Sequence, residues 1–120
     1  MIELLTGLPD RVVGVEAVGE VSAHDYETVL IPAFEAARAQ HDKVRVVFVA
    51  GERFEGFAAG ALWDDTKYGF SHFKGWGRVA LVTDIDWMRK LTHAFSWLSP
   101  SGMHVFPVAE LEAAKTWVTG

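Results

Sequence analysis

The sequence predicts one α/β domain with a mixed, mostly parallel five-stranded sheet flanked by four helices. Two observations lead to this prediction. Valine-rich runs such as Val44 to Ala50 and Arg78 to Thr83 have the composition of strands buried on both faces. These runs alternate with segments of helical periodicity, in the order β-β-α-β-α-β-α-β-α. Because crossover helices connect parallel strands, helices should cover both faces of the sheet.

Two strands joined by a turn are expected at the start of the chain. The segment "IELL" is followed by Gly7 to Asp10, whose residue types favour a turn. After the turn, apolar side chains alternate with Gly14 and Glu16 from Val13 to Ala17, which is the period of a strand. The first strand is expected to be an antiparallel edge of the sheet.

The first helix should begin at Ser22. Ser22 can cap the free amides, and Asp25 lies three residues further on, as in a capping box. Pro32 falls inside the apolar pattern, where it removes a hydrogen bond and crowds the preceding turn, so we expect a kink or two short helices. The apolar stripe of this helix consists of Tyr26, Leu30, Ala33, Phe34 and Ala37.

Two further helices are expected in the middle of the chain. A loop from Gly51 to Gly56 should lead to the second helix, at about Phe57 to Phe70. The third helix should run from Asp84 to Leu98. Its expected core face consists of Trp87, Leu91, Ala94 and Leu98.

The last strand and helix follow the segment "SPSG". The strand "MHVFPV" contains Pro107, which cannot donate to a ladder, so this strand is expected at an edge of the sheet. The segment from Ala109 to Val118 should form the closing helix.

The chain is acidic overall but has a cationic segment. Its 120 residues suit one domain, 50% of them are hydrophobic, and the formal net charge is −5. This balance argues against a nucleic-acid binder, which normally has a basic surface. Between Thr66 and His93, however, there are five basic residues and only two acidic ones. Solvated lysines are the ordinary explanation, but the asymmetry makes this segment a place to look for a binding surface.

No targeting or membrane-spanning segment is expected. The start "MIELLTGLPD" lacks a positive region followed by a long apolar run, and no apolar segment has the length of a membrane span. We therefore expect a soluble, cytoplasmic protein, with peripheral contact to a membrane surface left open.

No group of residues identifies a reaction. The chain has no cysteine, which excludes disulfides, thiolate metal sites and cysteine nucleophiles. Asp64, Asp65 and His72 can be combined into a metal site, but solvent-facing side chains are the simpler interpretation. There is no nucleophile elbow, and "GERFEGFAAG" lacks the lysine and the glycine spacing of a nucleotide-binding loop. We expect no catalytic residues, no metal, no cofactor and no enzyme.

The carboxyl ends of the strands are the first candidate site, because ligands of open α/β sheets bind there. In this sequence that edge gathers the segments 19–22, 51–56 and 83–87. The expected lining consists of Glu52, Arg53, Phe54, Asp84 and Trp87. A helix cap would explain one of the two aspartates, Asp84 or Asp86, without a functional role.

The second and third helices carry the other candidate binding residues. The second helix is apolar nearly all round, and Lys90, His93 and Trp97 share one side of the third. An exposed tryptophan among cations suits a protein partner, an acyl chain with an anionic head, or a membrane surface. Alternatively, Trp63 and Trp97 pack against each other under lysine stems. The candidates on these helices are Trp63, Lys67, Tyr68, Lys90, His93 and Trp97.

Four segments of the chain resemble one known family. They are "GLPDRVVGVEAVGEVSAHDYETVLIPAFEAA", "FEGFAAGALWDDTKYG", "GRVALVTDIDW" and "VFPVAELEAAKTWV". In order and spacing they are similar to the SpoIIAA-like family, also described as the STAS/SEC14-like group. The resemblance covers nearly the whole chain. It implies the β-α superhelix shared by anti-sigma-factor antagonists and lipid-carrying Sec14-type domains.

The resemblance does not extend to the phosphorylation switch of the anti-sigma antagonists. In those proteins, the family pattern places a phosphorylated serine at the start of the helix after the central strand. The matching segment here, Gly51 to Gly60, contains no serine or threonine, and the next hydroxyl is on Thr66. Glu52 and Glu55 would in addition repel a phosphate.

Two functions remain open. The first is a non-catalytic interaction or regulatory module whose partner contacts the second and third helices. The alternative is a carrier or sensor of a small amphipathic, lipid-like ligand held between these helices and the sheet. The edge strand near Met103 and the apolar helix surface would also permit a homodimer.

Overall fold

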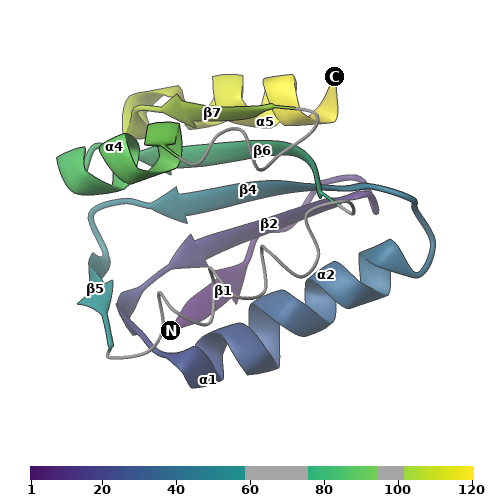
Figure 1. Ribbon diagram of the computed structural model, residues 1–120, viewed down its shortest axis with the longest axis horizontal. Helices are drawn as coiled ribbons and strands as arrows, with labels where there is room; N and C mark the ends of the chain where they lie inside the picture. The colour runs from purple at the N-terminus through teal and green to yellow at the C-terminus, as the bar shows by residue number, and fades with distance from the viewer. Residues whose placement is uncertain (59–75, 95–101) are drawn as a thin grey trace.

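A five-stranded sheet is the centre of the computed structural model, which describes residues 1–58, 76–94 and 102–120 (Figure 1). Its strand order is β1-β2-β4-β6-β7, with β1 antiparallel to β2 and all other neighbours parallel. The strands are β1 (Ile2–Leu4), β2 (Val12–Ala17), β4 (Val44–Ala50), β6 (Trp76–Thr83) and β7 (Met103–Phe106). The predicted mixed sheet, with its antiparallel first strand and its last strand at an edge, is confirmed.

Helices cover both faces of this sheet. The first helical stretch contains α1 (Ala23–Asp25), a π-helical turn η1 (Tyr26–Leu30) and α2 (Ile31–Arg38). The others are α4 (Asp86–Ala94) and α5 (Leu111–Thr119), the latter preceded by the 3-10 turn η4 (Val108–Glu110). The described residues thus contain three helical stretches rather than four, and most of the predicted second helix lies outside them.

The sheet buries two separate apolar layers because side chains alternate along each strand. On β4, Val44 and Val46 pack toward α2, whereas Val47 and Val49 pack toward α5. All four are buried, as predicted for a central parallel strand. Figure 1 shows α2 on one side of the sheet and α5 on the other.

The loop predicted from Gly51 to Gly56 and the helix start predicted at Phe57 are wrong, whereas the rest of the predicted helix lies outside the described residues. Phe54–Phe57 forms a short strand, β5, that pairs in parallel with β3 (Gly19–Val21) outside the main sheet. Gly19 and Gly56 have φ values of +62° and +137°, which favour glycine. The pairing depends on long-range contacts, and a glycine within a four-residue strand conceals the strand pattern.

Pro32 is accommodated by a change of helix register rather than by a break. The N–H of Ile31 donates to the carbonyl of Tyr26, five residues back, which closes the π-helical turn directly before Pro32. Pro32 then occupies the first turn of α2, where a missing N–H is tolerated. As a result, Tyr26 and Phe34 are both buried against the sheet.

Three arginines hold the carboxyl end of α5. Arg11 donates to the carbonyl of Thr119, and Arg78 donates to the carbonyl of Trp117. Arg45 donates to the carbonyls of both Val118 and Gly120. These carbonyls lack partners within the helix, and positive charge is favourable at this end of the helix dipole. Burial, together with the charges of Arg11 and Arg78, lowers the pKa of Arg45.

The predicted capping box at Ser22 is present. The Ser22 N–H donates to Asp25 Oδ2 at 2.8 Å, and the Asp25 N–H donates to Ser22 Oγ at 3.3 Å. The hydrogen bond from the Ser22 backbone is the main cause that lowers the pKa of Asp25 below its ordinary value of 3.8. The Met1 amino group, 3.2 Å from Asp25 Oδ2, acts in the same direction.

Replacing Asp25 by asparagine should therefore reduce stability by about 1 kcal/mol at neutral pH, the usual value of a helix cap. Because the folded-state pKa is lowered, the contribution is complete above the unfolded-state pKa and is lost as pH falls through the folded-state pKa. Urea unfolding should show the wild type and D25N converging as the pH falls below the folded-state pKa of Asp25. The exposed neighbour Glu27, replaced by glutamine, is the control. An equal effect of E27Q, or a pH-independent difference for D25N, would contradict this account.

Candidate interaction site

The carboxyl edge of the sheet brings aromatic residues of two segments, β5 and α4, together. The rings of Phe54 and Phe57 on β5 lie 5.0 Å apart at 63°, and the rings of Phe57 and Trp87 lie 6.0 Å apart at 71°. Such edge-to-face arrangements are favourable for aromatic pairs. Of the residues predicted for this edge, the structure therefore assembles Phe54 and Trp87 into one cluster. Phe57, which was predicted only as the start of a helix, connects them.

The predicted orientation of α4 is wrong. Its expected core face included Trp87, Leu91 and Ala94, but Met88 is its buried residue, packed against Leu81 and Ala50. Trp87 is 46% exposed and Leu91 is 42% exposed. The helical pattern permits either face, and the contact of Met88 with Leu81 is a tertiary feature that periodicity does not show. Two large apolar side chains are consequently left at the surface.

We call the group of Phe54, Phe57, Trp87 and Leu91 the aromatic rim. Three of its members, Phe57, Trp87 and Leu91, line an apolar cavity of about 150 Å³ on the sheet face that α2 also covers. The cavity is closed below by strand residues of β4 and β6 and at its sides by the first helical stretch, α4 and β7. Its described lining consists of Tyr26, Leu30, Val46, Phe48, Phe57, Val79, Leu81, Trp87, Met88, Leu91, Thr92 and Met103.

Several lining residues were missed from the sequence. Tyr26 and Leu30 were assigned only to a core stripe, and Met103 only to an edge strand. Tyr26 and Leu30 meet α4 because the first helical stretch lies on the same sheet face as α4. No local signal could have indicated this meeting, since these two segments are more than fifty residues apart in the sequence. Met103 lies beside α4 because β7 is the next strand after β6 in the sheet.

The charged residues predicted for this edge have structural partners or face solvent. The Arg53 guanidinium lies 3.2 Å from the carboxylate of Glu3 on β1 and 3.0 Å from that of Glu16 on β2. These ion pairs join the start of β5 to the first two strands. The hydrogen bond to Glu16 is the main cause that raises the pKa of Arg53. Asp84 Oδ1 accepts the Val108 N–H at 3.2 Å, and Glu52 is exposed. The aspartate thus holds the turn before α5.

Lys90 and His93 are exposed and share one side of α4, as predicted. That side lies away from Met88 rather than opposite the predicted core face. The candidates Trp63, Lys67, Tyr68 and Trp97 lie outside the described residues, so their part in this surface stays a prediction.

Within residues 1–58, 76–94 and 102–120, no group of three or more histidines, aspartates and glutamates is placed to hold a metal ion. None of the helices in this described part of the chain is long and apolar enough to cross a membrane.

Comparisons with known proteins assign the family. Residues 12–119 match the protein family described as SpoIIAA-like. The chain belongs to the SpoIIAA-like family. This confirms the resemblance seen in the sequence, and it agrees with the β-α layout of the structure. No protein with a curated description matches the sequence.

Two solved structures share the fold of this SpoIIAA-like chain. An uncharacterised protein with a SpoIIAA-like fold from Shewanella loihica PV-4 is 26% identical, with a TM-score of 0.72 over 98% of this chain and 92% of that one. The unphosphorylated anti-sigma factor antagonist SpoIIAA is 16% identical, with a TM-score of 0.63 over 98% of this chain and 97% of that one. The second likeness concerns the fold alone.

The buried hydroxyl of Thr83 positions α4, and the sequence did not single it out. Thr83 is fully buried at the end of β6, and its Oγ1 accepts the Ile85 N–H at 3.1 Å. The Arg89 guanidinium donates to the Thr83 carbonyl at 3.4 Å. Both contacts fix the turn from which Trp87 and Leu91 project.

Replacing Thr83 by valine should cost about 1 kcal/mol of stability, because the Ile85 N–H loses its acceptor while side-chain volume is kept. Amide hydrogen exchange should also accelerate from Ile85 to Arg89. The control is T116V, since the Thr116 hydroxyl only donates to the Glu112 carbonyl within α5. Unchanged exchange in α4 of T83V would show that this hydroxyl does not position the helix.

Proposed function

We propose that this chain is a non-catalytic interaction or regulatory module of the SpoIIAA-like type that works without the phosphoserine switch. Its protein partner docks on the aromatic rim and places one apolar side chain in the adjoining cavity. The observation that carries this proposal is the exposure of Trp87 and Leu91 at the mouth of an apolar cavity. Exposed apolar groups beside a pocket are typical of protein interfaces.

The volume of the cavity favours a side chain over a whole lipid. About 150 Å³ holds a group the size of benzene, whereas pockets for small-molecule ligands usually exceed about 300 Å³. A leucine, methionine or phenylalanine of a partner would fit this space. The aromatic rim would then surround the inserted side chain and exclude water from it.

Charge beside the rim suggests the chemistry of the partner. Lys90 lies next to Leu91 on the exposed side of α4, whereas the whole chain has a net charge of −5. A partner with an apolar side chain flanked by acidic groups would complement this surface and would be steered to it.

The non-catalytic part of the proposal rests on the roles of the polar groups at this edge. Arg53 is paired with Glu3 and Glu16, and Asp84 accepts a backbone N–H. These side chains position strands and turns. The cytoplasm is the compartment that we propose for such a module.

The second candidate function is a carrier or sensor of a small amphipathic ligand at the same cavity. The observation in its favour is the lining, which is apolar apart from the hydroxyls of Tyr26 and Thr92. Of these, the Thr92 hydroxyl already donates to the Met88 carbonyl. Native mass spectrometry of the purified protein tests this candidate, because a bound lipid would add its mass to the chain.

Leu91 and Leu4 provide a matched pair for testing the interaction surface. Both are exposed leucines, at 42% and 55%, but Leu4 lies on β1, away from the rim. A photoreactive phenylalanine at position 91 should capture a partner protein that the same group at position 4 does not capture. With that partner purified, L91A should weaken binding about tenfold and L4A should not, since a well-packed apolar contact contributes at least about 1.4 kcal/mol.

Other outcomes would contradict docking on the rim or change the identity of the partner. Equal loss of affinity in L91A and L4A, or equal capture at both positions, contradicts docking on the rim. Capture of a second copy of this chain would show that the partner is another copy and that the rim is a homodimer interface. A large loss of thermal stability in L91A would show that Leu91 contributes to the core instead.

A further inference from the structure

Three arginines lie side by side at the amino edge of the sheet. Arg11 directly precedes β2, Arg45 is the second residue of β4, and Arg78 is the third residue of β6. We call these three residues the arginine row. It contains half of the arginines in a chain whose net charge is −5. Its guanidinium groups meet the end of α5, which lies at the opposite end of the sheet from β5 and α4 (Figure 1).

The backbone of β4 and β6 brings Arg45 and Arg78 together. The register of the two strands shifts at this point, so that Gly77 and Arg78 both lie opposite Arg45. Both arginine side chains consequently reach α5. A Cβ atom at position 77 would lie only 3.0 Å from Cγ of Arg45, so the glycine leaves the space that the Arg45 side chain needs. The Arg78 guanidinium is oriented further by the Trp117 ring, whose centroid is 5.5 Å away.

The positive charge of the arginine row is not balanced by carboxylates. Within the part of the chain that the structure describes, no aspartate or glutamate forms an ion pair with a member of the row. The row donates instead to backbone oxygens at the end of α5, where the helix dipole is equivalent to about half a negative charge. About 2.5 positive charges therefore remain unbalanced. A full negative charge on the oxygens of Gly120 would still leave more than one.

The contrast with Arg53 shows what the row lacks. Arg53 is paired with two carboxylates, and its hydrogen bond to Glu16 raises its pKa. Burial, together with the like charges of Arg11 and Arg78, lowers the pKa of Arg45. An anion beside the row would relieve this repulsion.

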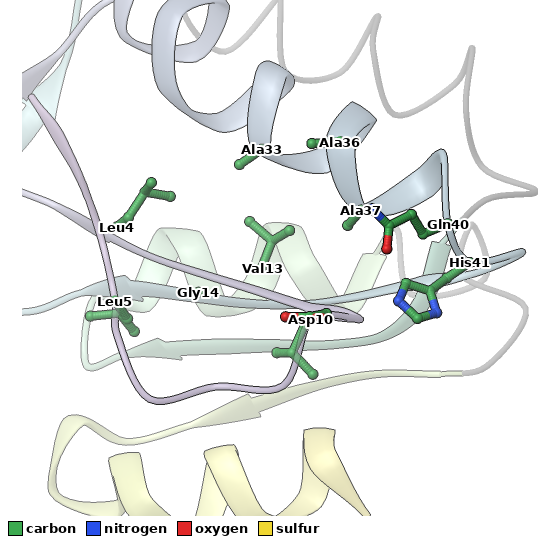
Figure 2. A pocket seen from close by; sticks show the side chains of 11 residues that line it. Leu4, Leu5, Asp10, Val13, Gly14, Ala33, Ala36, Ala37, Gln40 and His41 are labelled. Atoms are coloured by element: carbon green, nitrogen blue, oxygen red, sulfur yellow. The ribbon is translucent and has the colours of Figure 1, made fainter.

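Asp10, the neighbour of Arg11 in the sequence, does not supply that anion. It lines a second cavity, of about 370 Å³, whose facing wall contains Ala33, Ala36 and Ala37 of α2 (Figure 2). No member of the arginine row lines this cavity. Among the described residues, Asp10 forms no ion pair.

We propose that the arginine row binds a phosphate group, carried by a soluble phosphate ester or by a lipid headgroup. Each guanidinium has five N–H groups, and the bonds to α5 use one terminal nitrogen of each arginine. Arg11 is exposed and the other two arginines are half-buried, so an anion can approach from the solvent. A phosphate monoester carries close to two negative charges and three acceptor oxygens, which suits three guanidinium groups. A carboxylate has one charge and matches a single guanidinium.

Inorganic phosphate and pyrophosphate are the probes, and acetate at equal ionic strength is the reference anion. At ten times its dissociation constant, either phosphate should raise the melting temperature of the full chain by about 3 to 5 °C. In NMR spectra of the labelled protein, the same titration should shift the Nε–H signals of Arg11, Arg45 and Arg78. Acetate should bind at least fivefold more weakly than phosphate.

Arg11 and Arg38 provide a matched pair of variants. Both are exposed, and each donates to one backbone carbonyl, that of Thr119 and that of His41 respectively. Arg38 lies on α2, outside the row. R11Q should weaken phosphate binding at least fivefold, as expected for the loss of a charged donor, and R38Q should not change it.

Vesicles identify the source of the phosphate. Sedimentation of the chain with phosphatidylcholine vesicles that contain phosphatidic acid, but not with phosphatidylcholine alone, would indicate a lipid headgroup. Binding of dissolved phosphate without such sedimentation would indicate a soluble ester.

Four results would overturn the proposal. They are equal binding of acetate and phosphate, unchanged binding in R11Q, an equal loss in R38Q, and no binding of either phosphate or of the vesicles. The aromatic rim lies at the other edge of the sheet, so none of these results bears on the proposed function.

Discussion

The burial of β4 on both faces is the constraint on which the rest of the structure depends. β4 pairs with β2 on one side and β6 on the other, and its valines alternate between the α2 layer and the α5 layer. Each fully buried valine contributes roughly 1.5 kcal/mol or more, and a shift of register by one residue would exchange the two layers. The register is therefore strongly determined, and it aligns Ala50 of β4 with Thr83 of β6.

That alignment produces the candidate site. Because β4 and β6 end at the same level, the segments that leave them run side by side, and Phe57 meets Trp87 across thirty residues of sequence. Met88 then inserts against Leu81 and Ala50, which leaves Trp87 and Leu91 at the surface. The same packing that completes the core on this face thus generates exposed apolar surface next to a cavity. The candidate interaction surface therefore requires no helix or strand beyond those that form the core.

Sequence patterns within short segments correctly predicted the features that depend on interactions within those segments. The valine runs, the Ser22 capping box and the edge position of β7 were correctly predicted, since burial, capping and proline chemistry are readable from short segments. The family was correctly predicted from the resemblance of four segments in their order and spacing. Phe54 and Trp87 lie at the predicted edge of the sheet, and their part in binding stays a prediction. The predictions failed for β5 and for the face of α4. Both depend on contacts between distant segments, and a helix with several apolar residues can turn more than one face inward.

The two cavities border opposite ends of one helical stretch, and the π-helical turn relates them. Tyr26 and Leu30 line the cavity beside the aromatic rim, whereas Ala33 to His41 border the cavity in Figure 2. Each residue in an α-helix advances the side-chain direction by about 100°, so the one-residue change of register between these segments determines which face of α2 meets the sheet. Without the turn at Tyr26–Leu30, Phe34 would rotate away from the core and the alanines away from β2. The π-helical turn before Pro32 thereby determines which small side chains of α2 face β2.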